Sequence, residues 1–152
     1  MKFNFKIQQY QTDAVENTVS VFTGQPSKDN ALYRRDLGKV KTTLFSSEED
    51  DSGYRNADIE LSDTELLAKI RDIQSKQDIP ESKSLAHDLG RVGLDIEMET
   101  GTGKTYVYTH TIFELHKLYG INKFIIAVPS IPIKAGTGAF LNETYARAHF
   151  KN

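Results

Sequence analysis

The chain of 152 residues contains no cysteine, which excludes disulfide bonds and thiolate metal sites. It has no apolar N-terminal stretch resembling a signal peptide, and no apolar run long enough to cross a bilayer. Its four histidines lack the spacing of metal ligands, and no side chains follow a nucleophile–base pattern. We therefore expect a cytoplasmic protein of one domain or less that uses neither disulfides nor a histidine-bound metal.

The charge of the chain is nearly balanced, at −2 overall, but it is unevenly distributed. Between Phe45 and Glu65, eight acidic residues stand against one arginine. From Lys123 onward, four basic residues outweigh one glutamate. A charge run is most often a solvated face, which is the simpler interpretation of the acidic stretch. A nucleic acid would contact the C-terminal part instead.

One stretch, Met98–Thr105, has the sequence Met-Glu-Thr-Gly-Thr-Gly-Lys-Thr. The alternating run 94–98 predicts a strand before it, and a helical pattern follows it to about Tyr119. The two glycines let the backbone turn its N–H groups toward an anion, and the start of the helix adds the positive end of its dipole. Lys104 would reach the outer phosphates, and the Thr105 hydroxyl would ligate Mg²⁺. The stretch predicts a nucleotide-phosphate loop; the alternative is an ordinary glycine-rich turn between a strand and a helix.

The first position of this loop narrows the class of protein. Phosphate loops commonly carry glycine five positions before their second fixed glycine, and this chain has Met98 there. A larger residue at that position is typical of helicase-type loops, whereas small-molecule kinases and GTPases usually keep the glycine. Acidic residues alternate with apolar ones in the run 94–98, so we expect one face of this strand to be wet or covered by polar residues.

Apolar spacing and local signals predict the remaining elements. We expect a helix over 10–22, a helix from the capping box Ser62–Glu65 to about Gln77, a short helix over 84–89, a buried strand over 123–128, and a loop and helix over 131–150. The two strands and the helix between them would form a right-handed βαβ unit. The chain then divides into an N-terminal segment (1–22), an insertion (23–90) and a βαβ portion (91–152).

Three stretches carry a resemblance to a known family. They are Tyr10-Gln11-x-x-Ala14-Val15, then Met98 through Tyr108, and Lys123-Phe124-Ile125-Ile126-Ala127-Val128-Pro129-Ser130-Ile131-Pro132-Ile133-Lys134-x-Gly136. Together they resemble the N-terminus of the restriction (Res) subunit of type III restriction–modification systems, a branch of the superfamily 2 helicases. The helix that follows Ser62 also fits this family, whereas residues 23–60 match nothing we can place.

The resemblance implies an α/β fold: a partial RecA-like P-loop NTPase domain of parallel strands and flanking helices, with a polar, partly helical insertion. It implies ATP and Mg²⁺ as cofactors, with the metal on the Thr105 hydroxyl. Gln11 would recognise adenine, since its amide both donates and accepts, and Phe5 or Tyr10 could stack on the base. The implied nucleotide-binding residues are Gln11, Thr100, Gly101, Thr102, Gly103, Lys104 and Thr105. The implied contacts to the DNA backbone are Pro129, Ser130 and Lys134.

The partners that the resemblance implies are double-stranded DNA and the modification methyltransferase (Mod) subunit, and the implied function is ATP-dependent DNA cleavage. The family's Asp-Glu box, arginine finger and nuclease would follow residue 152, so no catalytic residue is expected in this chain. An arginine finger alone is worth about 10³–10⁵ in rate. We therefore expect the isolated chain to bind ATP·Mg²⁺ weakly, to hydrolyse little or none, and to associate through unpaired sheet edges. The alternatives are another superfamily 2 DNA helicase, a type I restriction motor, or a non-catalytic nucleotide-binding fragment.

Overall fold

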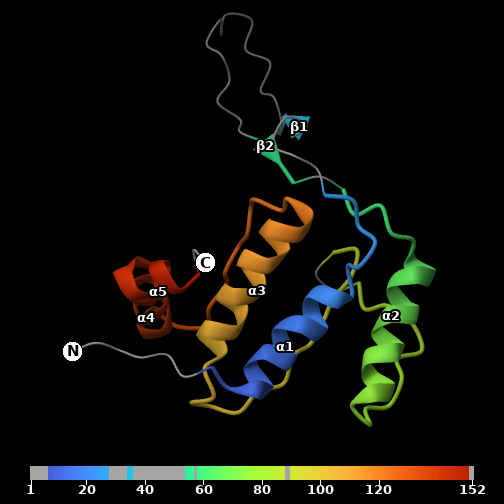
Figure 1. Ribbon diagram of the computed structural model, residues 1–152, viewed down its shortest axis with the longest axis horizontal. Coiled ribbons are helices and arrows are strands. Elements are labelled where there is room, and N and C mark those ends of the chain that lie inside the picture. Colours follow the sequence, from blue (N-terminus) through green and yellow to red (C-terminus); the bar gives the residue numbers. More distant parts are fainter. Residues whose placement is uncertain (1–6, 28–33, 36–53, 57, 88–89, 151–152) are drawn as a thin grey trace, which may run out of the picture.

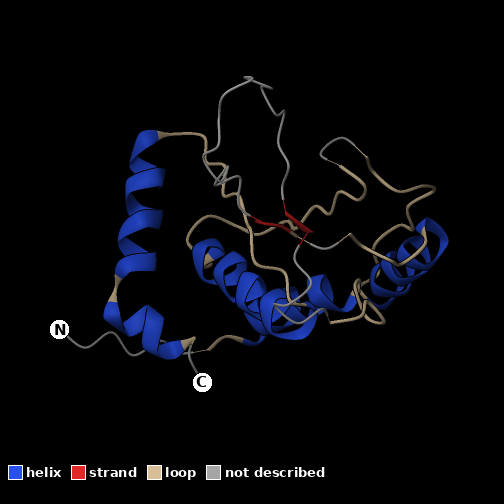
Figure 2. Ribbon diagram, turned by 90° about the horizontal axis from the view of Figure 1, so that it is seen from above, coloured by secondary structure: helices blue, strands red, loops and turns tan. Residues whose placement is uncertain are grey.

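The computed structural model describes residues 7–27, 34–35, 54–56, 58–87 and 90–150. In chain order its elements are α1 (Gln9–Ser20), β1 (Arg34–Arg35), β2 (Tyr54–Arg55), α2 (Asp63–Lys76), α3 (Lys104–Tyr119), α4 (Ile131–Asn142) and α5 (Thr144–His149). Figure 1 shows α1 between α3 and α2, with α4 and α5 beyond α3. In the view of Figure 2, α2 and the α4–α5 pair again lie at opposite ends of the molecule. Within the described part, no helix is both long and apolar enough to cross a membrane.

α1 and α3 pack side by side around the first of two apolar cores. Its buried side chains are Val15, Val19, Tyr106 and Val107. At the far end of the pair, the Tyr119 hydroxyl donates to the Val19 carbonyl at 3.3 Å. Gly120 then ends α3 in the left-handed conformation, at φ +67°. The helices predicted over 10–22 and 105–119 are confirmed, with ends shifted by one or two residues.

The second core lies around α2. Its buried side chains are Val21, Phe22, Leu61, Leu66 and Leu85. Leu66 is fully enclosed, with none of its surface exposed. Because Val21 and Phe22 directly follow α1, this core joins the C-terminal end of α1 to the predicted insertion.

α2 begins with the capping box that its sequence predicts. The Glu65 N–H donates to the Ser62 hydroxyl at 3.3 Å. In return, the Glu65 carboxylate accepts from the Ser62 hydroxyl at 2.6 Å and from the Ser62 N–H at 2.8 Å. These two hydrogen bonds lower the pKa of the Glu65 carboxyl below its ordinary value of 4.5, and the bond from the Ser62 hydroxyl has the larger effect. The positive charge of Lys69 lowers the pKa by a smaller amount.

The capping box predicts a pH dependence of stability. Since the folded-state pKa of Glu65 lies below its unfolded value, the stabilisation is complete above the unfolded value and is lost as the pH falls through the folded one. We expect Glu65→Gln to lower the urea midpoint of unfolding at neutral pH, and to lower it less at about pH 3. Urea titrations of both chains at the two pH values measure this effect. An equal difference at both would contradict it.

The two predicted parallel strands are not found, because in the described residues neither 94–98 nor 123–128 belongs to a sheet. The sheet that the described residues do contain is formed by β1 and β2, which pair antiparallel. A strand exists through its hydrogen-bonded neighbour, and neither run has such a neighbour among the described residues. Ile125 is accordingly 97% exposed, the opposite of the buried strand that its apolar surroundings predict.

Two further predictions differ from the structure. The described part of 84–89 contains no helix; Ala86 instead forms an isolated antiparallel bridge with Gly93, whose N–H donates to the Ala86 carbonyl at 2.7 Å. The Ala86 carbonyl is thereby used by Gly93 and is not left for a helical N–H. Over 131–150 there are two helices, α4 and α5, where a loop and one helix were predicted. The acidic run 48–51 lies outside the described residues.

Candidate nucleotide-binding site

The stretch 98–105 forms a tight turn that leads directly into α3. Gly101 and Gly103 have φ values of +86° and +89°, in the left-handed region that favours glycine. Gly103 is the N-cap of α3, and no side chain caps this end. The first N–H groups of α3 therefore lack intrahelical partners. Left-handed glycines before an uncapped helix start form a geometry suited to an anion.

Lys104 folds back across this turn. Its Nζ donates to the carbonyl oxygen of Met98 at 2.9 Å and to that of Glu99 at 2.8 Å. The Thr102 hydroxyl donates to the same Glu99 carbonyl at 2.6 Å. The Lys104 side chain is exposed, and no carboxylate of the described residues pairs with it. Its positive charge is thus available to an incoming anion.

Two neighbouring side chains at the start of α1 contact one atom of the loop. The Gln11 amide nitrogen donates to the Thr102 carbonyl at 2.9 Å, and the Tyr10 hydroxyl lies 3.1 Å from the same oxygen. A Cβ on Gly103 would lie only 2.5 Å from Gln11 Nε2, so this approach requires glycine. The structure therefore brings Gln11 to the loop, across 91 residues of sequence, but places its amide on the loop itself. Phe5, the other candidate for stacking, lies outside the described residues.

The remaining loop residues fit the phosphates and metal of a nucleotide. Thr105 lies in the first turn of α3, and its hydroxyl has no hydrogen-bond partner among the described residues. Thr100 is exposed at the turn. In the described part of the chain, no group of three or more His, Cys, Asp or Glu side chains could hold a metal ion. The arrangement suits Mg²⁺ arriving with nucleotide phosphates, because this ion commonly keeps few protein ligands.

A groove of about 740 Å³ opens beside the loop, between α1 and α2. The segment 93–99 lines it, and Tyr10 and Thr102 mark where it meets the loop. The acidic side chains of this segment, Asp95, Glu97 and Glu99, are exposed. The acidic side chains are therefore solvated, but the segment forms no strand whose faces could differ, and Ile96 between them is also exposed, at 46%.

The residues expected to contact DNA lie at the start of α4. Pro129 and Ser130 are exposed, and Ser130 is the N-cap of the helix without a side-chain cap. Lys134 is also exposed, and its N–H donates to the Ser130 carbonyl at 3.0 Å. Their neighbours Ile131 and Ile133 are 83% and 49% exposed. These residues form a separate surface, on a different element from the phosphate loop.

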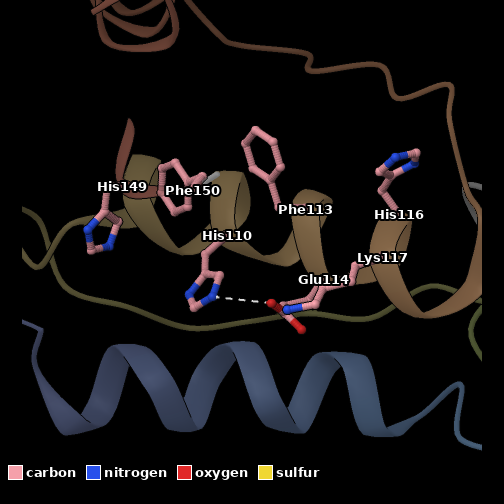
Figure 3. A pocket seen from close by; sticks show the side chains of 7 residues that line it. All are labelled: His110, Phe113, Glu114, His116, Lys117, His149 and Phe150. Atoms are coloured by element: carbon pink, nitrogen blue, oxygen red, sulfur yellow. Dashed lines mark ion pairs between the residues drawn. The ribbon is translucent and has the colours of Figure 1, made fainter. Parts of the chain in front are cut away.

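A second cavity, of about 270 Å³, lies between α3 and α5. Figure 3 shows His110 turned toward Glu114, with 3.7 Å between Nε2 and Oε1. The rings of Phe113 and Phe150 stack, with their centroids 5.1 Å apart. This cavity is lined by the aromatic contacts that hold the C-terminal helix against α3, and it is separate from the loop.

Sequence reasoning found the loop residues but missed the contact between Tyr10 and Thr102. The Tyr10-Gln11 pair was interpreted only in terms of a base. No sequence signal specifies which backbone oxygen a side chain will reach across 92 residues. Similarly, the glycine pattern indicated a turn but not that Gly103 makes room for Gln11.

Comparison with known proteins gives a consistent result. A family model described as "Type III restriction enzyme, res subunit" matches residues 4–149. The Res subunit of the type III restriction-modification enzyme EcoPI, from Escherichia phage P1, is 42% identical over 116 residues, which is 74% of this chain and 12% of that protein. The EcoP15I Res subunit from Escherichia coli is 44% identical over 97 residues, which is 64% of this chain and 10% of that protein.

A third relative, the StyLTI Res subunit from Salmonella typhimurium, is 52% identical over 60 residues, 40% of this chain and 6% of its own length. The chain thus spans about a tenth of the length of the curated relatives it matches. The family match covers nearly the whole chain, including the phosphate loop. This chain belongs to the type III restriction enzyme Res subunit family, and with it to the proteins of P-loop NTPase-like fold.

Proposed function

We propose that this chain is the ATP-binding N-terminal part of a type III restriction endonuclease subunit, a helicase-like motor that uses ATP and is coupled to DNA cleavage. The observation that carries the proposal is the loop 98–105. It combines two left-handed glycines, an uncapped helix start and a lysine that no described carboxylate neutralises. The relatives, named as restriction-modification enzymes, support the motor and nuclease part.

ATP binding would use the loop as follows. The N–H groups from Thr100 to Thr105 would donate to phosphate oxygens, helped by the positive end of the α3 dipole. Lys104 would exchange the carbonyls of Met98 and Glu99 for phosphate oxygens, gaining stronger charge-assisted hydrogen bonds. The Thr105 hydroxyl would take the Mg²⁺ that accompanies the phosphates. When bound, ATP supplies the phosphoanhydride bond whose hydrolysis drives the motor.

Gln11 would recognise the adenine in this proposal. Its amide nitrogen carries two N–H groups and donates one of them to the Thr102 carbonyl, so the other could donate to a base while the contact with the loop is kept. The position of Gln11 beside the loop supports this role.

The finer architecture and the partners are part of the same proposal. The runs 94–98 and 123–128 would pair as parallel strands of a RecA-like sheet where neighbouring strands are present. They would lie in a βαβ portion (91–152) that follows an N-terminal segment (1–22) and an insertion (23–90).

Double-stranded DNA would contact Pro129, Ser130 and Lys134, whose exposure at the start of α4 supports this. The Mod subunit would be the protein partner, in the cytoplasm.

Replacing Lys104 with alanine tests the proposed function. The variant loses the ammonium that would bind the outer phosphates, and hydrogen bonds to charged groups are worth about 1.5–3 kcal/mol. We therefore expect at least about a tenfold loss of affinity for ATP in the presence of Mg²⁺. Isothermal titration calorimetry on the purified chain measures it.

Lys117→Ala is the matched control, since this lysine lies in the last turn of the same helix. It should leave ATP affinity unchanged. If the Lys104 and Lys117 variants bind ATP as tightly as the wild type, the loop is not a nucleotide site and the proposed function is wrong.

A further inference from the structure

One backbone carbonyl of the loop accepts two side-chain hydrogen bonds from α1. The Thr102 oxygen lies 2.9 Å from Gln11 Nε2 and 3.1 Å from the Tyr10 hydroxyl. A carbonyl oxygen has two lone pairs, so these two donors use its full capacity. The loop is thus tied to the first turn of α1 at a single point, the peptide between Thr102 and Gly103.

This peptide matters because its two ends are coupled. In a trans peptide the C=O and N–H bonds are coplanar and point in opposite directions, and the described residues contain no cis peptide. Holding the Thr102 carbonyl toward α1 therefore directs the Gly103 N–H away from α1, to the opposite face of the turn. The side chains that hold the carbonyl thereby set the direction of a neighbouring donor.

Tyr10 makes this contact without being part of the core. Its side chain is 48% exposed, and neither apolar core includes it. Its hydroxyl is turned to the loop, at the point where the groove begins. A residue retained for stacking alone would need the ring but not this hydrogen bond.

We propose that Tyr10 is a positioning residue of the phosphate loop, whose hydroxyl orients the Thr102–Gly103 peptide for anion binding. This inference rests on the proposed ATP-binding function. Removing the Tyr10 hydroxyl would leave Gln11 as the remaining side-chain donor to the Thr102 carbonyl among the described residues. Tyr10 thus acts on the phosphates through the loop and not on the adenine.

The test compares ATP with inorganic tripolyphosphate, which has no base. Tyr10→Phe keeps the ring and removes the hydroxyl, so a positioning role predicts weaker binding of both ligands. A hydrogen bond worth about 1 kcal/mol gives roughly a fivefold loss, with the ratio of the two affinities little changed. Calorimetry with Mg²⁺ on the purified chain measures both constants.

Tyr119→Phe is the matched control. Its hydroxyl also joins α3 to a backbone carbonyl of α1, that of Val19, but at the far end of the helix pair. The inference requires that Tyr119→Phe bind both ligands like the wild type. An equal loss in the Tyr119 variant would assign the effect to general weakening of the α1–α3 pair, and would overturn the inference.

The remaining outcomes separate this inference from the function on which it rests. Unchanged ATP binding by Tyr10→Phe, or a loss confined to ATP, overturns the positioning role while leaving ATP binding intact. If the wild-type chain binds neither ATP nor tripolyphosphate, the proposed function fails and this inference fails with it.

Discussion

Replacing Gly103 with alanine is expected to remove measurable ATP binding and to destabilise the fold. The residue sits at φ +89°, where a side chain costs about 1–2 kcal/mol. The new Cβ would also lie 2.5 Å from Gln11 Nε2, so Gln11 must move and give up its hydrogen bond to the Thr102 carbonyl. That bond adds about 0.5–1.5 kcal/mol, for a total near 2–3 kcal/mol. Urea unfolding and calorimetry with ATP measure the two effects.

Gly101→Ala separates the two causes in the Gly103 variant. Gly101 has nearly the same φ, +86°, but its Cβ would meet nothing within 4 Å. It should therefore show the backbone strain without the displacement of Gln11, and lose less stability than Gly103→Ala. Combining Gly103→Ala with Gln11→Ala should recover part of the packing cost. If the two glycine variants are equally destabilised, the contact with Gln11 does not explain the need for glycine.

Replacing Leu66 with alanine is expected to have the largest effect on stability. Leu66 is completely buried in the core that also contains Phe22 and Leu61. Truncating such a leucine removes apolar burial and leaves a cavity, and typically costs about 2–5 kcal/mol. This is a large share of the roughly 5–15 kcal/mol that stabilises an ordinary domain. Urea unfolding monitored by circular dichroism should therefore show a markedly lower midpoint.

Leu118→Ala is the matched control for Leu66. It is also a helical leucine, but its side chain is 44% exposed, so little burial is lost and little cavity forms. If Leu118→Ala shifted the urea midpoint as much as Leu66→Ala, the core around α2 would contribute no more to stability than an exposed site. The same comparison tests whether the predicted insertion contributes to the stability of the whole chain.

The helices could be predicted from sequence because their signals are local. The capping box at Ser62 and Glu65 and the glycine at 120 lie within one turn of the helix ends they determine. Apolar spacing likewise identified the buried face of α1, with Val15 and Val19. For these elements, the residues that decide the structure are neighbours in sequence.

Sequence alone could not decide whether the strands form or how part of the site is held, because both depend on residues far apart in the chain. The run 123–128 is apolar enough for a buried strand, yet Ile125 is 97% exposed, since no strand of the described residues pairs with the run. Motif reasoning found the loop from Thr100 to Thr105, but the hydrogen bonds of Tyr10 and Gln11 join residues more than 90 positions apart. Periodicity within a segment carries no information about such contacts.

The bond between Gln11 and Thr102 closes a chain segment of 91 residues. The entropy of closing a flexible segment grows only with the logarithm of its length, so doubling that length costs about 0.6 kcal/mol. The packing of α1 on α3 closes the same segment. Residues added between α1 and α2 would therefore change the stability of the phosphate loop very little. The length of the intervening chain is free to vary while the loop and its tether to α1 stay the same.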